Sequence, residues 1–155
     1  MGIRITDYLT PDLVKIPLAS TDKTAAITEL VDLLASRGKT RDRNGLLNAV
    51  LEREAQRTTG VGRGLAIPHA KTDVCPQLVM AFGRSDTPID FASIDGKPVR
   101  LIPLLAGPPD QTGPHIHILA RLGRITMNDT LLNDLLTAPN AQTFWEVLRR
   151  YDETA

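Results

Sequence analysis

The sequence predicts a mixed α/β sandwich, in which helices cover a sheet. Short apolar runs typical of buried strands alternate with segments that carry apolar side chains at helical spacing. Apolar residues make up 42% of the chain and charged residues 23%, which provides enough apolar side chain for one core. A length of 155 residues suits one domain, so we expect residues 1–155 to form a single domain.

The first third of the chain predicts a short strand and two helices. Residues 12–17 (DLVKIP) are strand-like, and Asp22 can cap the helix that follows. Gly38 ends that helix, and a second helix runs from about residue 42 to residue 56. The apolar face of the first helix is Ile27, Leu30, Val31 and Leu34. The expected buried stripe of the second is Leu46, Leu47, Val50 and Leu51.

The middle of the chain predicts three strands. A short strand is expected over residues 65–67, and Pro68 limits its length. The runs LVMAFG at 78–83 and VRLIPLLA at 99–106 are typical of buried strands. Residues 85–97 between them are rich in Asp, Pro and Gly, which indicates a loop or a hairpin.

The last third of the chain predicts helices. Gly113-Pro114 opens one, with proline in the first turn, and two more are expected over residues 129–137 and 141–150. The expected apolar face of the helix that begins at 113 is Ile116, Leu119, Ala120 and Gly123.

Composition argues against several classes of function. Eighteen basic residues balance eighteen acidic ones and aromatic residues are only 4%, so we expect no nucleic-acid partner. We expect a cytoplasmic protein, because the first residues have no apolar signal-peptide core and no run approaches the roughly 18 apolar residues of a membrane span. Cys75 is the only cysteine, so it cannot form an internal disulfide and we interpret it as a bystander thiol.

The run GVGRGLAIPHA places one of only three histidines, His69, directly after a glycine-rich segment. Three interpretations compete: a histidine satisfied by backbone groups, a metal ligand and a nucleophile. A metal site is disfavoured because His115 and His117, two residues apart on a helix, point in different directions. Neutral imidazole is a good nucleophile near pH 7, and an attack on a phosphoryl donor would produce phosphohistidine. Glycines let backbone N–H groups come close to such a group.

The run Glu54–Ala70, EAQRTTGVGRGLAIPHA, resembles the active-site signature of the IIA components of the bacterial phosphoenolpyruvate-dependent phosphotransferase system. The match is to the fructose/mannitol type, which includes the stand-alone nitrogen-regulatory IIA proteins. In that pattern an acidic or amide residue is followed after six positions by aliphatic-Gly, then by aliphatic-Ala-aliphatic-Pro-His and a small residue. Most relatives have glycine after the histidine, where this chain has Ala70.

The resemblance extends over nearly the whole chain and implies a fold and a set of site residues. The implied fold is a mixed parallel and antiparallel sheet flanked by helices, as in mannitol-type IIA domains. The resemblance implies that His69 accepts a phosphoryl group on Nε2, while its other ring nitrogen donates to a backbone carbonyl. PHIHILARLGRI resembles the later helix of the family, and its alignment makes His115, rather than His117, the second active-site histidine. Arg53 stands where the family keeps an arginine that contacts the phosphorylated histidine.

Other residues near the motif have open interpretations. Glu54 either braces Arg53 or caps the loop, and Arg57 and Arg63 either add positive potential or are solvated. His117 is expected at the surface. A partner would need an apolar rim around His69, for which the candidates close in sequence are Val61, Leu65 and Ile67.

The resemblance implies a phosphocarrier that needs no metal or cofactor. A phosphorylated carrier of the HPr type would donate to His69, and His69 would donate to an acceptor such as a IIB domain. The chain contains neither a IIB domain nor a membrane segment, which favours a regulatory IIA protein. Two alternatives remain open: a sugar-specific IIA component with a separate IIB partner, and a binding module that transfers no phosphoryl group.

Overall fold

A mixed six-stranded sheet forms the centre of the computed structural model, which describes residues 3–154. The strands are β1 (Val14–Lys15), β2 (Gly60–Gly62), β3 (Leu65–Ala66), β4 (His69–Lys71), β5 (Val79–Ile89) and β6 (Val99–Gly107). Their order is β1-β5-β6-β3-β2, and β4 pairs with β6 beyond the end of β3. The pairs β5–β6 and β2–β3 are antiparallel, whereas β1–β5, β3–β6 and β4–β6 are parallel. The expectation of a mixed sheet is therefore confirmed.

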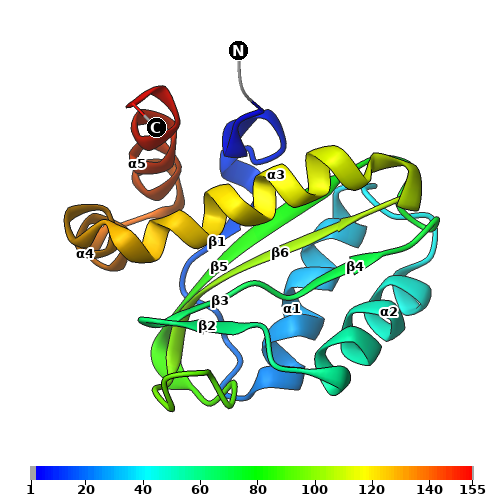
Figure 1. The fold of residues 1–155 in the computed structure, drawn as a ribbon, viewed down its shortest axis with the longest axis horizontal. Helices are drawn as coiled ribbons and strands as arrows, with labels where there is room; N and C mark the ends of the chain where they lie inside the picture. Colours follow the sequence, from blue (N-terminus) through cyan, green and yellow to red (C-terminus); the bar gives the residue numbers. More distant parts are fainter. Residues whose placement is uncertain (1–2, 155) are drawn as a thin grey trace.

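Helices cover both sides of the sheet, as Figure 1 shows. They are α1 (Lys23–Ser36), α2 (Arg43–Gln56), α3 (Thr112–Gly123), α4 (Asp129–Thr137) and α5 (Ala141–Thr154). Helices α1 and α2 pack on one side, against β5 and β4 respectively, and α3 packs against β6 on the other. The expected cap at Asp22 is confirmed, since its carboxylate accepts from the amide of Ala25 at 2.8 Å. Asp42 caps α2 in the same way, through the amide of Gly45 at 3.0 Å.

Three expected strand boundaries differ from those observed. The strand expected over residues 12–17 is reduced to β1, because Pro11–Leu13 forms a 3-10 turn. The strand expected over 65–67 ends at Ala66, and the chain re-enters the sheet at His69 as β4. The segment 85–97, expected as a loop or a hairpin, belongs to the hairpin of β5 and β6, but the strand expected to end at residue 83 continues to Ile89, where it pairs with Val99.

The face of α3 that packs on the sheet is not the one its apolar residues predicted. The buried residues are His115, Ile118, Arg121 and Leu122. Ile116, which was expected to face the core, is 58% exposed. The expectation was wrong because two of the four buried positions are polar, and a count of apolar side chains therefore selects the wrong face.

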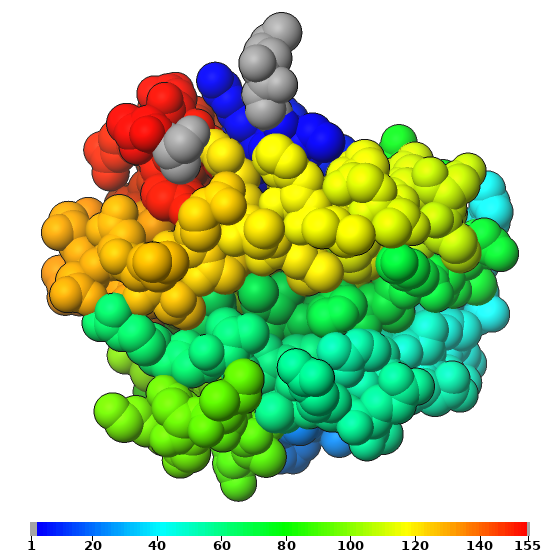
Figure 2. All heavy atoms as spheres, viewed as in Figure 1, coloured from blue at the N-terminus to red at the C-terminus, as the bar shows by residue number. Residues whose placement is uncertain are grey.

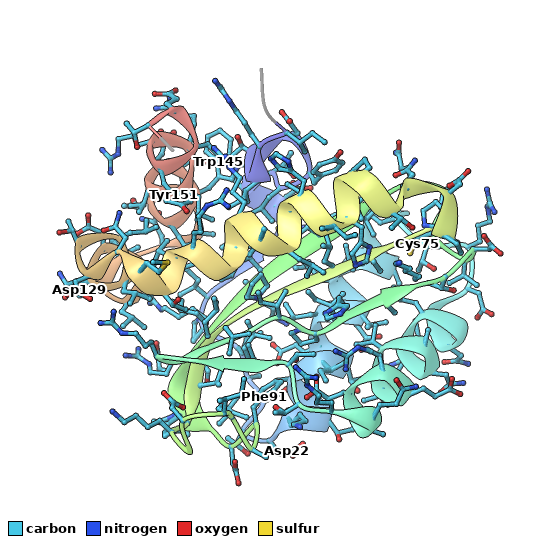
Figure 3. The ribbon with its side chains drawn as sticks, in the orientation of Figure 1. Asp22, Cys75, Phe91, Asp129, Trp145 and Tyr151 are labelled. Carbon is cyan, nitrogen blue, oxygen red and sulfur yellow. The ribbon has the colours of Figure 1, made fainter. Side chains whose placement is uncertain are left out.

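The core joins the two ends of the chain to the sheet. Phe82 of β5 meets Phe144 of α5 edge to face, with ring centroids 4.9 Å apart. Trp145 points from α5 toward the N-terminal turns (Figure 3), where its Nε1–H donates to the carbonyl of Leu9 at 2.7 Å. On α2, Leu46 and Val50 are buried as expected, while Leu47 and Leu51 are only partly buried. None of the helices within residues 3–154 is long and apolar enough to cross a bilayer.

Candidate functional site

His69 begins β4 and is held by the backbone on both sides. Its pairing with Leu105 fixes the strand beside β6, and the carbonyl of Pro68 accepts from the amide of Leu105 at 3.0 Å. The Nδ1 atom lies 2.8 Å from the carbonyl oxygen of Ile67. A carbonyl can only accept, so Nδ1 carries the proton in the neutral ring and Nε2 keeps its lone pair. This contact identifies the backbone carbonyl that the sequence left unspecified.

His115 lies beside His69, although the two residues are distant in the sequence. Their ring centroids are 5.7 Å apart and the rings meet edge to face at 73°. His115 is 1% exposed, and neither of its ring nitrogens has a hydrogen-bond partner among residues 3–154. Burial, followed by the charges of His69 and Lys71, lowers the pKa of His115 to about 4. His115 is therefore neutral at pH 7, with an unused N–H donor.

His69 also has a pKa below its ordinary value. The largest cause is burial, which lowers this pKa. The hydrogen bond to Ile67 and the negative charge of Glu54 raise it, whereas the positive charges of Arg53 and Lys71 lower it further. A lowered pKa keeps the half-buried imidazole of His69 neutral and nucleophilic at pH 7.

Two hollows open beside His69, and Arg53 lines both. The larger, about 350 Å³, contains Arg53, His69 and Lys71. The smaller, about 240 Å³, lies between His69 and the side of α3. The Nη1 of Arg53 donates to the carbonyl of Arg57 at 2.9 Å, which leaves the rest of its guanidinium fork free to meet an anion. The site therefore combines a nucleophilic nitrogen, cations and an unused N–H donor.

The family model for "Phosphoenolpyruvate-dependent sugar phosphotransferase system, EIIA 2" matches residues 7–151. The chain belongs to this EIIA family. The match confirms the resemblance seen in the Glu54–Ala70 motif.

Relatives of this EIIA chain carry both sugar-specific and regulatory names. It is 40% identical over 149 residues to the fructose-specific EIIA component of Haloferax volcanii, covering 96% of this chain and 97% of the relative. It is 34% identical over 151 residues to the nitrogen regulatory protein of Bradyrhizobium diazoefficiens, covering 97% and 98%. The fructose-specific EIIABC component of Bacillus subtilis is 34% identical over 151 residues, but the chain spans only 24% of that longer protein.

Solved EIIA structures share the fold. The nitrogen regulatory protein IIA-Ntr of Neisseria meningitidis superposes with a TM-score of 0.86 at 28% identity, over 93% of this chain and 98% of that one. The IIA domain of the Escherichia coli mannitol enzyme, solved in complex with phosphorylated IIB, superposes with a TM-score of 0.79 over 92% and 97%. At 18% identity, the second comparison supports the fold alone.

The glycines before His69 form a tight turn and a close contact between two loops. Gly62, Arg63 and Gly64 all have positive φ angles, of 105°, 55° and 83°, and form the turn between β2 and β3. A Cβ on Gly60 would lie 2.2 Å from Oγ of Ser93, so this glycine permits close packing of two loops. None of the three glycines lines the two hollows beside His69. They shape the approach to β4.

Glu54 caps the loop and does not brace Arg53. It is 6% exposed, and its carboxylate accepts from the amide of Thr59 at 2.9 Å and from the Thr59 hydroxyl. It also pairs with Nζ of Lys23 at 3.0 Å. These contacts stabilise the turn after α2. The carbonyl of Arg57 in this turn accepts the hydrogen bond from Arg53.

We expect Glu54→Ala to destabilise this EIIA domain by about 3 kcal/mol, because it leaves the buried Thr59 amide and hydroxyl without an acceptor. Glu54→Gln, which keeps one carbonyl acceptor, should cost about 1 kcal/mol. Urea unfolding measures both, with the exposed neighbour Glu52→Ala as a control that should change little. Equal effects of alanine at 54 and at 52 would contradict the loop-capping role.

Lys71 is a site residue that the sequence analysis missed. It is exposed, lines the larger hollow and bears electrostatically on both histidines. The signal was present, since residues two apart in a strand share a face and Lys71 follows His69 at that spacing.

The remaining candidates lie at or beyond the edge of the site. His117 is exposed as expected, and Arg57 lines the smaller hollow. Arg63 points away from the site and pairs with Asp129 of α4. Cys75 is buried. No cluster of three or more potential metal ligands occurs within residues 3–154.

The free energy of unfolding should decrease as the pH falls through the range in which His115 becomes protonated. The unfolded chain takes up this proton near pH 6.5, but the folded chain does so only near pH 4, so the unfolded state binds more protons between these values. The free energy of unfolding should therefore drop, by on the order of 3 kcal/mol, as pH falls from 6.5 to 4. Urea titrations across this range should show a shallower drop for His115→Asn and an unchanged one for His117→Asn. Parallel curves for His115→Asn and wild type would contradict this.

Proposed function

We propose that residues 1–155 act as a single histidine phosphocarrier domain of the phosphotransferase system, with His69 as the phosphoryl acceptor. The observation that carries this proposal is the pairing of a free Nε2 on His69 with a buried, unpartnered imidazole 5.7 Å away, measured between ring centroids. Family membership supports the same reading. The donor is a phosphohistidine carrier of the HPr type.

The transfer begins with the Nε2 lone pair of His69. It attacks the phosphorus of the donor phosphohistidine in line, and the phosphorus–nitrogen bond of the donor breaks as the new one forms. The donor imidazole, which carries a proton on its other ring nitrogen, leaves with the electron pair of that bond and becomes neutral. The Nδ1–H of His69 stays hydrogen-bonded to the carbonyl oxygen of Ile67 throughout. No proton therefore needs to move between the two proteins.

The neighbouring side chains stabilise the transferred group. The N–H of His115 donates to a phosphoryl oxygen and so gains a hydrogen-bond partner that residues 3–154 do not provide. Arg53 supplies a fixed, forked donor set, and Lys71 adds a second positive charge beside the same hollow. These groups offset the charge of the three oxygens without a metal ion.

An apolar rim beside His69 provides the docking surface for the donor and for the acceptor. Its members are Val61, 43% exposed, Ile94, 75% exposed, and Ile116, 58% exposed. Val61 and Ile94 line the smaller hollow together with His69, and Ile116 follows His115 on α3. Figure 2 shows α3 as a ridge directly above the strand residues that precede and include β4. Leu65 and Ile67, considered earlier for this rim, are buried and are not part of it.

Ile94→Asp should raise the KM for the phosphorylated donor about tenfold, because it places a charge in the apolar centre of the docking surface. The expected kcat is unchanged, since Ile94 does not touch the reacting atoms. Met127→Asp is the matched control: Met127 is 82% exposed and lines neither hollow beside His69. Equal effects of the two variants would argue against the rim.

The acceptor belongs to one of two classes. In the mannitol system of Escherichia coli, a IIA domain of this fold forms a complex with phosphorylated IIB. The 34% identity to a nitrogen regulatory protein, over 98% of that relative, favours a regulatory role, in which phosphorylation changes which target proteins bind. The 40% identity to a fructose-specific EIIA component favours the second candidate, a sugar-specific carrier with a separate IIB partner.

The deciding experiment is intact mass spectrometry after incubation with phosphoenolpyruvate, enzyme I and HPr. The proposal requires one added phosphoryl group, mapped by peptide analysis to His69 and lost on mild acid treatment. Subsequent addition of a fructose-type IIB then distinguishes the two acceptor classes, because only a sugar-specific carrier should be dephosphorylated by it. No added mass with an active carrier system would favour a binding module without phosphoryl transfer.

A further inference from the structure

A third hollow, of about 260 Å³, lies apart from the histidine site and has an apolar floor. We call its four apolar lining residues the floor: Leu101 is buried, Leu136 is partly buried, and Pro88 and Pro98 are exposed. These residues come from the end of β5, the start of β6 and the helix α4, which meet the β2–β3 turn on one edge of the molecule (Figure 1). Only Arg63 and Gly64 link this hollow to the glycine-rich motif, and none of its residues lines either hollow beside His69.

The rim of this hollow carries cations. Its charged lining residues are Arg63, Lys97 and Arg100, and no carboxylate from residues 3–154 lines it. Arg63 is engaged with Asp129 and with the carbonyl of Thr126 at 2.8 Å. Arg100 donates from Nε to the carbonyl of Ser85 at 2.9 Å, and its Nη2 lies 3.6 Å from Asp86.

Lys97 is the cation of this rim that forms no close ion pair within residues 3–154, although Asp95, two residues before it, interacts with it electrostatically. No carboxylate lies within 4 Å of its ammonium among residues 3–154, and its side chain is exposed at the mouth of the hollow. Its backbone is fixed, since the amide of Lys97 donates to the carboxylate of Asp95 at 3.1 Å. A ligand anion at this mouth would meet one ammonium without a close ion pair and two guanidinium groups held in place by existing hydrogen bonds.

We propose that this hollow binds a small organic anion, with a compact apolar group on the proline and leucine floor and a carboxylate or phosphate toward Lys97. Its volume is below the roughly 300–1,000 Å³ of pockets that hold drug-sized ligands, so the occupant is a ring-sized or branched-chain molecule. The apolar floor provides affinity, and the cationic rim selects the negative charge. This site does not depend on the proposed phosphocarrier function.

Fluorine NMR titration with 4-fluorobenzoate tests the proposal, alongside the neutral 4-fluorobenzamide and the cationic 4-fluorobenzylamine. We expect 4-fluorobenzoate to bind with a Kd of about 1 to 10 mM, because so few atoms can contribute only a small binding free energy. It should bind about tenfold more tightly than the amine. Amide shifts in nitrogen-15 spectra should centre on Gly64, Lys97 and Leu101. Phenyl phosphate, in a parallel titration, shows whether the rim prefers a phosphate to a carboxylate.

Two variants separate this site from nonspecific anion binding. Lys97→Glu should weaken 4-fluorobenzoate about tenfold, whereas Lys39→Glu, a lysine outside the hollow, should leave the Kd unchanged. Equal binding of the three fluorinated probes, an unaltered Kd in Lys97→Glu, or shifts centred on Ala70 and Lys71 would each overturn the proposal. So would the absence of saturable binding by wild-type protein whose unfolding midpoint is normal.

Discussion

Replacement of His69 by alanine should abolish phosphorylation by the donor carrier, a loss of about 10³-fold or more in rate. No other described histidine can take its place, because His115 is 1% exposed and His117 lies outside the hollows that Arg53 lines. The measurement is intact mass over time with phosphoenolpyruvate, enzyme I and HPr, beside the wild type. The fold should be intact, since His69 is only half-buried at the end of a strand.

The other two histidines provide the internal controls for this result. His115→Ala should slow phosphorylation about 10²-fold, which is the usual effect of removing one donor to a developing anion. His117→Ala should leave the rate little changed. Phosphorylation of the His69→Ala variant at a different histidine would contradict the assignment of the acceptor. Similar losses for His115→Ala and His117→Ala would contradict the assignment of the second histidine.

Asp152→Ala should give the largest loss of stability, about 3 to 5 kcal/mol. Asp152 is 2% exposed and accepts from Nε of Arg121 at 2.9 Å. It also accepts from the amides of Ile5 and Thr6, at 3.1 and 2.9 Å, and from the Thr6 hydroxyl at 2.9 Å. Its removal leaves two backbone donors without an acceptor and leaves the buried guanidinium of Arg121 with the backbone carbonyl of residue 152 but no carboxylate. The expected result is a lower urea midpoint with a similar m value.

An exposed Arg–Asp pair in the same protein is the matched control for Asp152. Asp129 pairs with Arg63, but its side chain is 81% exposed. Asp129→Ala should therefore cost less than about 1 kcal/mol. Because Arg121 lies on the same helix as His115, Asp152→Ala should also slow phosphorylation at temperatures where the variant is still folded. Comparable stability losses at positions 152 and 129 would show that burial is not what gives the Arg121–Asp152 pair its effect.

Features that depend on neighbouring residues were predictable from the sequence. Asp22 was recognisable as the start of a helix, because a capping carboxylate bonds to an amide three residues away. The second helix was expected to begin near residue 42, where Asp42 proves to be the cap. The strands at 78–83 and 99–106 were recognisable because both faces of a central strand are covered, which produces continuous apolar runs. The Glu54–Ala70 motif alone indicated the family that the comparison with the family model confirms.

The face of α3 was not predictable, because burial follows from what the helix packs against. Ile116 is more apolar than His115, yet His115 faces the sheet and Ile116 faces solvent. The buried position of Arg121 depends in turn on Asp152, which the C-terminal helix brings to it. Helical periodicity predicts that the most apolar face of a helix is buried. It cannot predict the burial of a face whose polar side chains are hydrogen-bonded to residues from elsewhere in the chain.

By itself, the sequence determined the family, the identity of His69 as the candidate nucleophile and the approximate positions of the main helices and strands, since all of these rest on local spacing. Only the tertiary structure decided which face of α3 is buried, what Glu54 holds and where the cation-rimmed hollow lies. The physical reason is that sheet register and helix packing set these contacts. Both join segments that are distant in the chain, and no local rule fixes them.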